Sequence, residues 1–422
     1  MAARAQELAD PFDLSSAYRR TRDLSVAIAA PLSDADATIQ PHADASPAKW
    51  HLAHTTWFFE TFVLRDHVPG YRRYDESWAY LFNSYYEAEG ARHARDRRGM
   101  LARPSLDAIL GWRTAVDARI AQALPDLPPA ARDLVLLGIN HEQQHQELML
   151  TDMLAAFAAN PLDPAVWDRP RNQPAPLIDM GWIEGREGVV EIGHDGAGFA
   201  FDCEGPRHRT LLVPHALADR PVTNAEWQQF IADGGYQRPE LWLSDGWAWV
   251  KREQIEAPLY WRRDGDGGWL AFALDGLHPL HPAAPVTHIA LYEADAFARW
   301  AGARLPTEAE WESAAQALDP AAGTQLDSAG PVRPRAARWS TSPHQMFGDV
   351  WEWTGSAFLP FPGFRPAAGA VGEYNGKFMS GQSVLKGASC ATPRGHSRAS
   401  YRNFFYPWQR WQFTGVRLAK DL

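Results

Sequence analysis

The feature that most constrains the fold is a change in residue pattern near position 160. Four amphipathic stretches of helical length precede it, separated by turns that contain Pro or Gly: residues 11–30, 47–67, 105–124 and 129–157. Residues 160–179 are Pro-rich and read as a linker. Gly, Trp and short strand-like runs follow, with few helices, among them 223–233 and 290–301. We therefore expect an α+β protein with a four-helix bundle in residues 1–159, a linker in 160–179 and a second domain in 180–422.

Two histidines, His141 and His145, lie four residues apart within the last helical stretch, so both point from one face of the helix. That face is otherwise the inward stripe of the helix. Its other members are Leu134, Gly138, Leu148 and Asp152. Because buried imidazoles without partners are costly, the spacing favours a metal site over a pair of core histidines.

The same segment fits the H-E-x-x-H signature of zinc proteases, with Glu142 as the general base. Such a protease needs a third ligand, usually on a following helix. After Phe157 the chain instead enters its Pro-rich segment. A zinc-dependent hydrolase is therefore a distant alternative.

A third histidine is available on the second helical stretch, which begins after Ser46 with Pro47 at its first position. One histidine from this helix and the later pair would form a three-His set with one side of the metal open. Both His51 and His54 are candidates, and spacing does not choose between them.

Composition excludes several classes of protein. A net charge of −10 and the lack of a basic stripe argue against a nucleic-acid partner. The sequence has no apolar run of membrane-spanning length and no signal-peptide pattern at its start, so we expect no membrane partner and a cytoplasmic location. Cys203 and Cys390 are the only cysteines, and one bridge between them is the most that they permit.

The second half carries a distinctive set of motifs: Pro285-Val286-Thr287, Arg304-Leu305-Pro306-Thr307-Glu308-Ala309-Glu310-Trp311-Glu312, Gly348-Asp349-Val350-Trp351-Glu352-Trp353-Thr354 and Arg417-Leu418. Together they resemble the formylglycine-generating-enzyme/sulfatase-modifying domain, which implies a C-type-lectin-like fold. Thr307 is expected to cap a short helix, with Glu310 three positions on. Most of the Trp side chains are expected to pack in the core.

The helical half resembles the DinB-like domain, and the fusion of the two domains resembles the ergothioneine-biosynthesis sulfoxide synthases, the EgtB family. The motifs that carry this resemblance are Trp50-x-x-x-His54, Phe82-Asn83-Ser84-Tyr85-Tyr86-Glu87, His141-x-x-Gln144-His145 and Tyr401-Arg402-Asn403-Phe404-Phe405-Tyr406-Pro407. The resemblance implies a mononuclear non-haem Fe(II) site that uses O2 to join sulfur to the imidazole C2 of hercynine. It selects His54 as the first ligand, beside His141 and His145, and leaves His51 as a neighbour of the site or a core residue.

The resemblance also implies substrate contacts. Gln144, Asn403 and Phe404 are expected near hercynine, whose quaternary ammonium suits aromatic surroundings. The tyrosine that one branch of the family carries in its C-terminal domain is absent here. The Tyr85-Tyr86 pair, typical of the other branch, is therefore expected to donate a proton or hydrogen atom, although packing alone is the alternative.

The prediction of which sulfur or selenium donor the enzyme uses depends on two further features. Arg92, Arg95 and Arg98 form a basic cluster that reads either as a solvated loop or as a clamp for a donor carboxylate. Phe405 stands where the branch that uses gamma-glutamylcysteine has an acid, which favours cysteine as the thiol donor. The related selenoneine synthases take a selenosugar as a selenol donor, and the stretch Ser380-Gly381-Gln382-Ser383 keeps that alternative open.

Two other classes of protein fit the sequence less well. A lectin-like binding module would explain the aromatic half but not the three-His set. A formylglycine-generating enzyme would need active-site cysteines near the C-terminus, for which Cys390 alone is a poor match.

Overall fold

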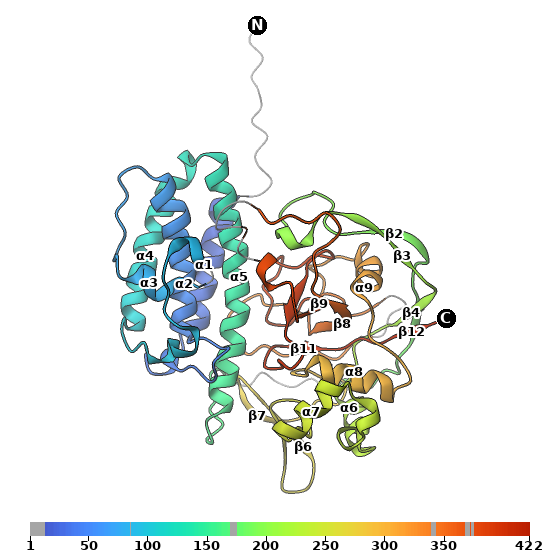
Figure 1. The fold of residues 1–422 in the computed structure, drawn as a ribbon. Coiled ribbons are helices and arrows are strands. Elements are labelled where there is room, and N and C mark those ends of the chain that lie inside the picture. Colours follow the sequence, from blue (N-terminus) through green and yellow to red (C-terminus); the bar gives the residue numbers. More distant parts are fainter. Residues whose placement is uncertain (1–12, 85, 169–174, 339–342, 368–371, 373–374) are drawn as a thin grey trace.

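A computed structural model describes residues 13–84, 86–168, 175–338, 343–367, 372 and 375–422. It has a helical domain followed by a β-rich domain, which confirms the α+β class (Figure 1). Within the described residues, no helix combines the length and apolar character that a membrane span requires.

The helical domain contains the four predicted helices. They are α1 (Leu14–Ala29), α2 (Ala48–Phe59), α4 (Leu106–Ala123) and α5 (Pro129–Ala158), with a short α3 (Trp78–Phe82) between α2 and α4. Side chains at the helix starts explain two of the boundaries, because Asp13 and Ser105 accept hydrogen bonds from backbone N–H groups of the first turns of α1 and α4. α2 continues as a π-helical segment, η2 (Glu60–Arg65), and a 3-10 segment, η4 (Arg95–Met100), precedes α4.

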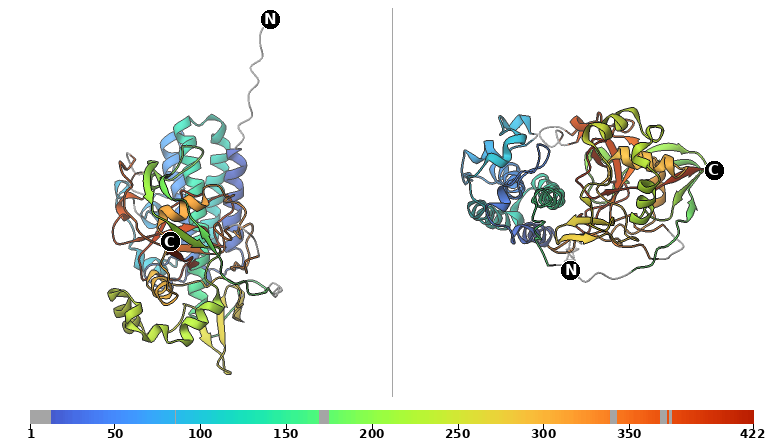
Figure 2. Two further views of the ribbon diagram at one scale, coloured as in Figure 1. Left: turned by 90° about the vertical axis from the view of Figure 1, so that its right-hand side faces the viewer. Right: turned by 90° about the horizontal axis from the view of Figure 1, so that it is seen from below.

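Helix α5 stands between the other bundle helices and the β-rich domain (Figures 1 and 2). Its inward face packs closely against α2 at Gly138, where an added Cβ would lie 2.4 Å from the ring of Phe59 and 2.9 Å from that of Phe58. A larger residue at this position would force the helices apart. This close approach brings the histidines of α2 and α5 together.

Among its described residues, the β-rich domain has short strands in four small sheets, with the orders β1-β4-β12, β10-β9-β8-β11, β2-β3 and β5-β6-β7. The strands are β1 (Trp182–Glu184), β2 (Gly188–Ile192), β3 (His208–Leu212), β4 (His215–Ala218), β5 (Trp261–Arg263), β6 (Trp269–Ala273), β7 (Gly276–Pro279), β8 (Trp351–Ala357), β9 (Ser383–Gly387), β10 (Asn403–Phe405), β11 (Thr414–Gly415) and β12 (Ala419–Asp421). In the second sheet β8 pairs with β9 antiparallel and with β11 parallel. This sheet carries the 403–405 motif toward the bundle.

In the described part of this domain, the strands are accompanied by the helices α6 (Asn224–Ala232), α7 (Ser244–Glu253), α8 (Leu291–Trp300) and α9 (Glu308–Ala315). The predicted cap of α9 is confirmed, because Thr307 and Glu310 form a reciprocal capping box. α7 was not predicted. Its start has no capping side chain, so the sequence lacks the usual signal.

One hydrophobic cluster spans the two domains: bundle residues such as Leu150 and Leu154 pack in it with Phe272, Leu326 and Phe413 of the β-rich domain. A buried carboxylate adds polar contacts across the boundary. Glu147 of α5 accepts hydrogen bonds from Trp351 Nε1 at 2.8 Å and Thr392 Oγ1 at 2.7 Å. Cys203 and Cys390 are buried free thiols, so the bridge that the sequence permitted is not present.

Candidate metal centre and the cavity beside it

Three histidines meet where α2 and α5 pack together. His54 comes from α2, and His141 and His145 come from α5. One ring nitrogen from each lies within 4.8 Å of the others, a separation at which three imidazoles can bind one metal ion. The structure thus groups His54, rather than His51, with the helical pair.

The surroundings of the three rings favour neutral imidazoles, the form that binds metal. Burial lowers the pKa of His54 and His145 well below the usual value, and it lowers the pKa of His141 to about 3. The Nδ1 atom of His54 lies 2.6 Å from the carbonyl oxygen of Phe82, to which it can only donate. The Nε2 atom of His54 therefore keeps a lone pair for a metal.

His51 lies behind His145 and links it to a carboxylate. The Nε2 atom of His51 is 3.0 Å from Asp152 Oδ2, and its Nδ1 atom is 2.8 Å from Nδ1 of His145. Donation by His51 Nε2 to Asp152 leaves His51 Nδ1 as an acceptor for the N–H at His145 Nδ1. The Nε2 atom of His145 is then free to bind a metal.

The β-rich domain contributes a hydrogen bond to the chain of contacts that joins His145, His51 and Asp152. Trp411 Nε1 donates to Asp152 Oδ1 at 3.0 Å, and the backbone N–H of Ser46 donates to Asp152 Oδ2 at 2.7 Å. Asp152 thus receives contacts from both domains. We infer that docking of the two domains helps to set the orientation of His145.

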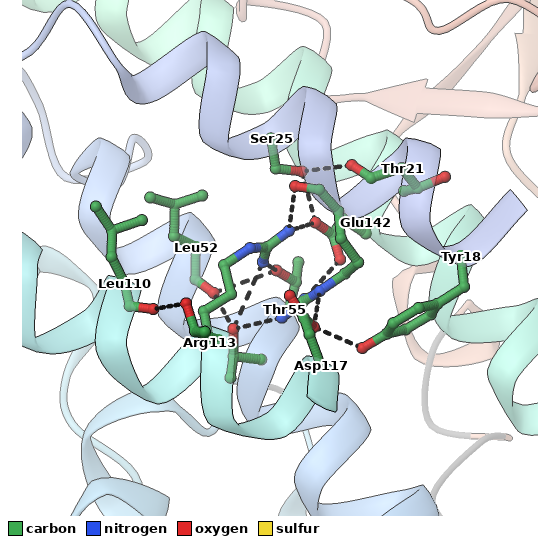
Figure 3. Close-up of polar contacts among 12 residues, drawn as sticks. Tyr18, Thr21, Ser25, Leu52, Thr55, Leu110, Arg113, Asp117 and Glu142 are labelled. Atoms are coloured by element: carbon green, nitrogen blue, oxygen red, sulfur yellow. Dashed lines mark hydrogen bonds and ion pairs between the residues drawn. The ribbon is translucent and has the colours of Figure 1, made fainter. Parts of the chain in front are cut away.

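Glu142, the general base in the protease interpretation, lies in the bundle core beside Ser25 and Arg113 (Figure 3). Its carboxylate accepts from Arg22 Nη1 at 2.8 Å, from Arg113 Nη2 and from Ser25 Oγ at 2.5 Å. Burial alone would raise the pKa of Glu142, but the two guanidinium groups outweigh it and hold that pKa below its usual value. Glu142 is a structural anion and does not have the position of a zinc-protease base.

A cavity of about 310 Å³ lies beside the histidines, between the domains. His141, Gln144 and His145 of α5 line one side, and Asn403, Phe404 and Phe405 of β10 come from the other domain. Further aromatic lining is provided by Trp50, Phe201, Trp351, Phe378, Tyr401 and Trp411. The candidate site is therefore composite, with the three histidines on the bundle and much of the cavity wall on the β-rich domain.

Comparisons with known proteins identify both halves. Residues 17–149 match the DinB superfamily, and residues 169–340 and 340–422 match the sulfatase-modifying factor enzyme 1-like domain. Curated proteins named hercynine oxygenase are similar over most of the chain. The protein from Mycolicibacterium smegmatis is 33% identical over 416 residues, which cover 92% of this chain and 94% of that protein. The Mycobacterium tuberculosis protein is 32% identical over 412 residues, with the same coverage of 92% and 94%. The chain belongs to the hercynine oxygenase family.

A third relative, from Mycolicibacterium thermoresistibile, is 33% identical over 408 residues, with 89% of this chain and 88% of that protein covered. Membership of the hercynine oxygenase family makes the chain an enzyme, and the His54, His141 and His145 set fits a non-haem iron oxidoreductase. Both resemblances stated from the sequence, to the DinB-like domain and to the sulfatase-modifying domain, are confirmed.

The basic cluster divides into three different environments. Arg98 is buried, donates to Ser46 Oγ at 2.9 Å and lies 3.3 Å from the ring centre of Trp50. Arg95 is exposed at the cavity edge and donates to the backbone oxygen of Asp44. Arg92 pairs with Glu87 and is not among the described residues that line the cavity. Two of the three predicted arginines thus reach the cavity.

The tyrosine pair is placed only in part. Tyr85 lies outside the described residues. Tyr86 is buried, and its ring packs against Phe62 at 5.1 Å and Trp57 at 5.5 Å between ring centres. It is not among the described residues that line the cavity. A role for either tyrosine in proton or hydrogen transfer stays a prediction.

Three groups that support the site, Asp152, Tyr401 and His396, were not predicted to do so. Tyr401 accepts from Gln144 Nε2 at 2.7 Å, and His396 Nε2 lies 3.3 Å from the same hydroxyl. Asp152 was placed on the inward stripe without a function, and its polar character there was the signal that could have revealed one. Tyr401 is the first residue of the motif at 401–407, but nothing in the sequence showed that its partner would be Gln144, 257 residues away.

Proposed function

We propose that this chain is an Fe(II)- and O2-dependent enzyme that joins the sulfur of cysteine to the imidazole C2 of hercynine, as part of ergothioneine biosynthesis. The observation that carries the proposal is the three-His set beside an aromatic interdomain cavity. The names of the relatives support hercynine as the substrate.

The donor set fits iron. Three neutral imidazoles hold Fe(II) while leaving coordination positions open, and His54, His141 and His145 are the residues that would hold it. Bound there, iron would supply the redox chemistry that O2 requires. The protein supplies the substrate positions and keeps the ligand tautomers fixed through Phe82 O and His51.

Hercynine has a trimethylammonium group that cannot donate hydrogen bonds, so aromatic faces are its natural partners. Phe404 is held for this purpose, because its ring stacks on Phe358 with centres 4.1 Å apart. Gln144, which donates to Tyr401, and Asn403 line the same cavity, and we propose that they contact the polar atoms of this substrate. We assign hercynine to the space between α5 and β10.

The cysteine donor carries a carboxylate, for which Arg95 and Arg98 are the proposed partners at the cavity wall. Phe405 also lines this cavity, so the acid expected for gamma-glutamylcysteine is replaced by an apolar ring. Gamma-glutamylcysteine should therefore be the poorest donor.

A second candidate is selenoneine synthesis, in which a selenosugar donates selenium to hercynine. The observation that favours it is Gln382, from the stretch before the core of β9, which lines the cavity with a neutral polar side chain suited to sugar hydroxyls. An uncharged sugar would depend little on Arg95.

The experiment is a donor competition. The protein is loaded anaerobically with Fe(II), then given hercynine, O2 and equal concentrations of cysteine, gamma-glutamylcysteine and a selenosugar, and products are identified by mass spectrometry. We expect the cysteine adduct to dominate. Failure of an iron-loaded protein to modify hercynine with any donor would contradict the function, and preference for gamma-glutamylcysteine would contradict the donor assignment.

Arginine variants then test the clamp. Arg95→Ala should lower kcat/KM for cysteine by roughly tenfold or more, since a charge-assisted hydrogen bond contributes about 1.5–3 kcal/mol. Arg92→Ala is the matched control, because Arg92 is exposed, paired with Glu87 and outside the cavity wall. A selenosugar optimum that is insensitive to Arg95→Ala would select the second candidate.

A further inference from the structure

Gln412 is a buried polar residue in the cavity wall, and none of the sequence motifs includes it. Its side chain is 2% exposed and lines the cavity beside the histidines. Neither its Nε2 nor its Oε1 atom has a hydrogen-bond partner among the described residues. An amide buried in this state loses its contacts with water and gains none from the protein, which costs folding free energy.

The backbone around Gln412 is held in place. Its carbonyl oxygen accepts from His288 Nδ1 at 2.8 Å and from the backbone N–H of Thr414 at 2.8 Å. The preceding Trp411 is bound to Asp152, and the following residues enter β11. The chain therefore presents this amide from a fixed position.

Three other amides of the cavity wall have protein partners among the described residues. Gln144 donates to Tyr401, Asn403 accepts from the backbone N–H of Phe404, and Gln409 donates to Asp44 at 3.3 Å. Gln412 differs from them because both its donor and its acceptor remain available to the cavity.

We propose that Gln412 is a substrate-binding residue for an amino-acid substrate, donating through Nε2 to a carboxylate and accepting an N–H at Oε1. The inference rests on the proposed function, in which two amino-acid-derived substrates enter this cavity. Both offer the required chemistry: hercynine has a carboxylate and an imidazole N–H, and cysteine has a carboxylate and an ammonium. The test below distinguishes these two sources.

The decisive variant is Gln412→Leu, which keeps the size of the side chain and removes both polar atoms. Because the amide has no partner among the residues that the structure describes, the iron-loaded variant without substrate should be as thermally stable as wild type or more so. Its iron content should be unchanged. If Gln412 had a structural role, its substitution would instead lower the thermal stability of the protein.

Substrate binding should weaken. Loss of two hydrogen bonds predicts an increase of about 5- to 100-fold in the dissociation constant of the substrate concerned. Hercynine binding is measured by anaerobic calorimetry on the Fe(II)-loaded protein, and KM is measured separately for cysteine, gamma-glutamylcysteine and the selenosugar. A raised Kd for hercynine would show that Gln412 binds hercynine. An unchanged Kd for hercynine with a raised KM for the donor would show that Gln412 binds the donor.

Gln412→Glu and Gln325→Leu complete the set. Glu has the same size but replaces the donor with a second oxygen, so it should weaken carboxylate binding at least as much. Gln325 is the matched control, because it is also buried, its Oε1 also has no partner among the described residues, and it does not line the cavity. Its Leu variant should bind both substrates as wild type does.

Two results would overturn the inference. Wild-type affinities for hercynine and every donor in Gln412→Leu would mean that only water occupies the amide. A marked loss of stability or iron in that variant would show a structural role. Failure of the wild-type protein to bind hercynine is a different result, since it removes the proposed function and this inference with it.

Discussion

Replacement of Glu142 by Gln tests whether this carboxylate stabilises the bundle or acts in chemistry. The carboxylate is 1% exposed and pairs with Arg22 and Arg113, which are 2% and 1% exposed. Glu142→Gln keeps the shape but leaves two buried guanidinium groups, with Asp117, 30% exposed, as the remaining partner of Arg22. Removing one partner from a buried ion pair costs about 3–5 kcal/mol.

This destabilisation can be converted into a melting temperature. The unfolding entropy is about 2.1 cal/mol/K per residue, so the same free energy lowers Tm by roughly 4 °C if all 422 residues unfold together. The shift is roughly 12 °C if the bundle unfolds alone. Calorimetry on wild type and variant measures it. Asp133→Asn is the control, because Asp133 is an exposed acid on the same helix.

The pH dependence sharpens the test. Because the pKa of Glu142 is held below 4.5, its contribution is present above that pH and is lost as pH falls through the lowered value. The difference between variant and wild type should therefore be full at neutral pH and shrink only in acid. The reasoning is refuted if Glu142→Gln is as stable as Asp133→Asn at pH 7, or if it keeps its stability and iron but loses turnover.

Three further outcomes are expected. His54→Ala should abolish tight Fe(II) binding, whereas His51→Ala should retain iron with an affinity lowered by about 10–100-fold. An anaerobic competition titration measures both affinities, and the opposite order of the two variants would reverse the ligand assignment. Burial raises the pKa of Asp349 to about 6 from an ordinary 3.8. The folded protein therefore loses stability as the pH rises through 6 and Asp349 ionises, and the loss amounts to roughly 3 kcal/mol. Asp349→Asn, which suits the positive φ of 66° at this position, should thus gain stability over wild type at pH 8 but not at pH 4, and a gain independent of pH in denaturant titrations would argue against burial as the cause. If Tyr85 or Tyr86 is the proton or hydrogen donor, one single Phe variant should bind iron and hercynine normally while losing product, and wild-type product formation in both variants would exclude the pair.

The local elements of the fold could be predicted because their signals lie within a few residues of one another. Ser105 caps α4 and Thr307 with Glu310 caps α9, each through contacts three residues apart. The four-residue spacing of His141 and His145 likewise depends only on helix geometry. The third histidine of the set could not be predicted from spacing, because spacing left His51 and His54 equivalent. Only the family motif chose between them.

The sequence by itself determined the α+β division, the helices that carry the ligands and the composition of the motif on β10. Tertiary structure alone decided which way Glu142 points, because its partners Arg22 and Arg113 lie 120 and 29 residues away on other helices. It also joined Trp411 to Asp152 across 259 residues and left the amide of Gln412 facing the cavity. Helix periodicity sets the face on which a side chain lies, but the partner on that face is set by the packing of distant segments, which no local pattern encodes.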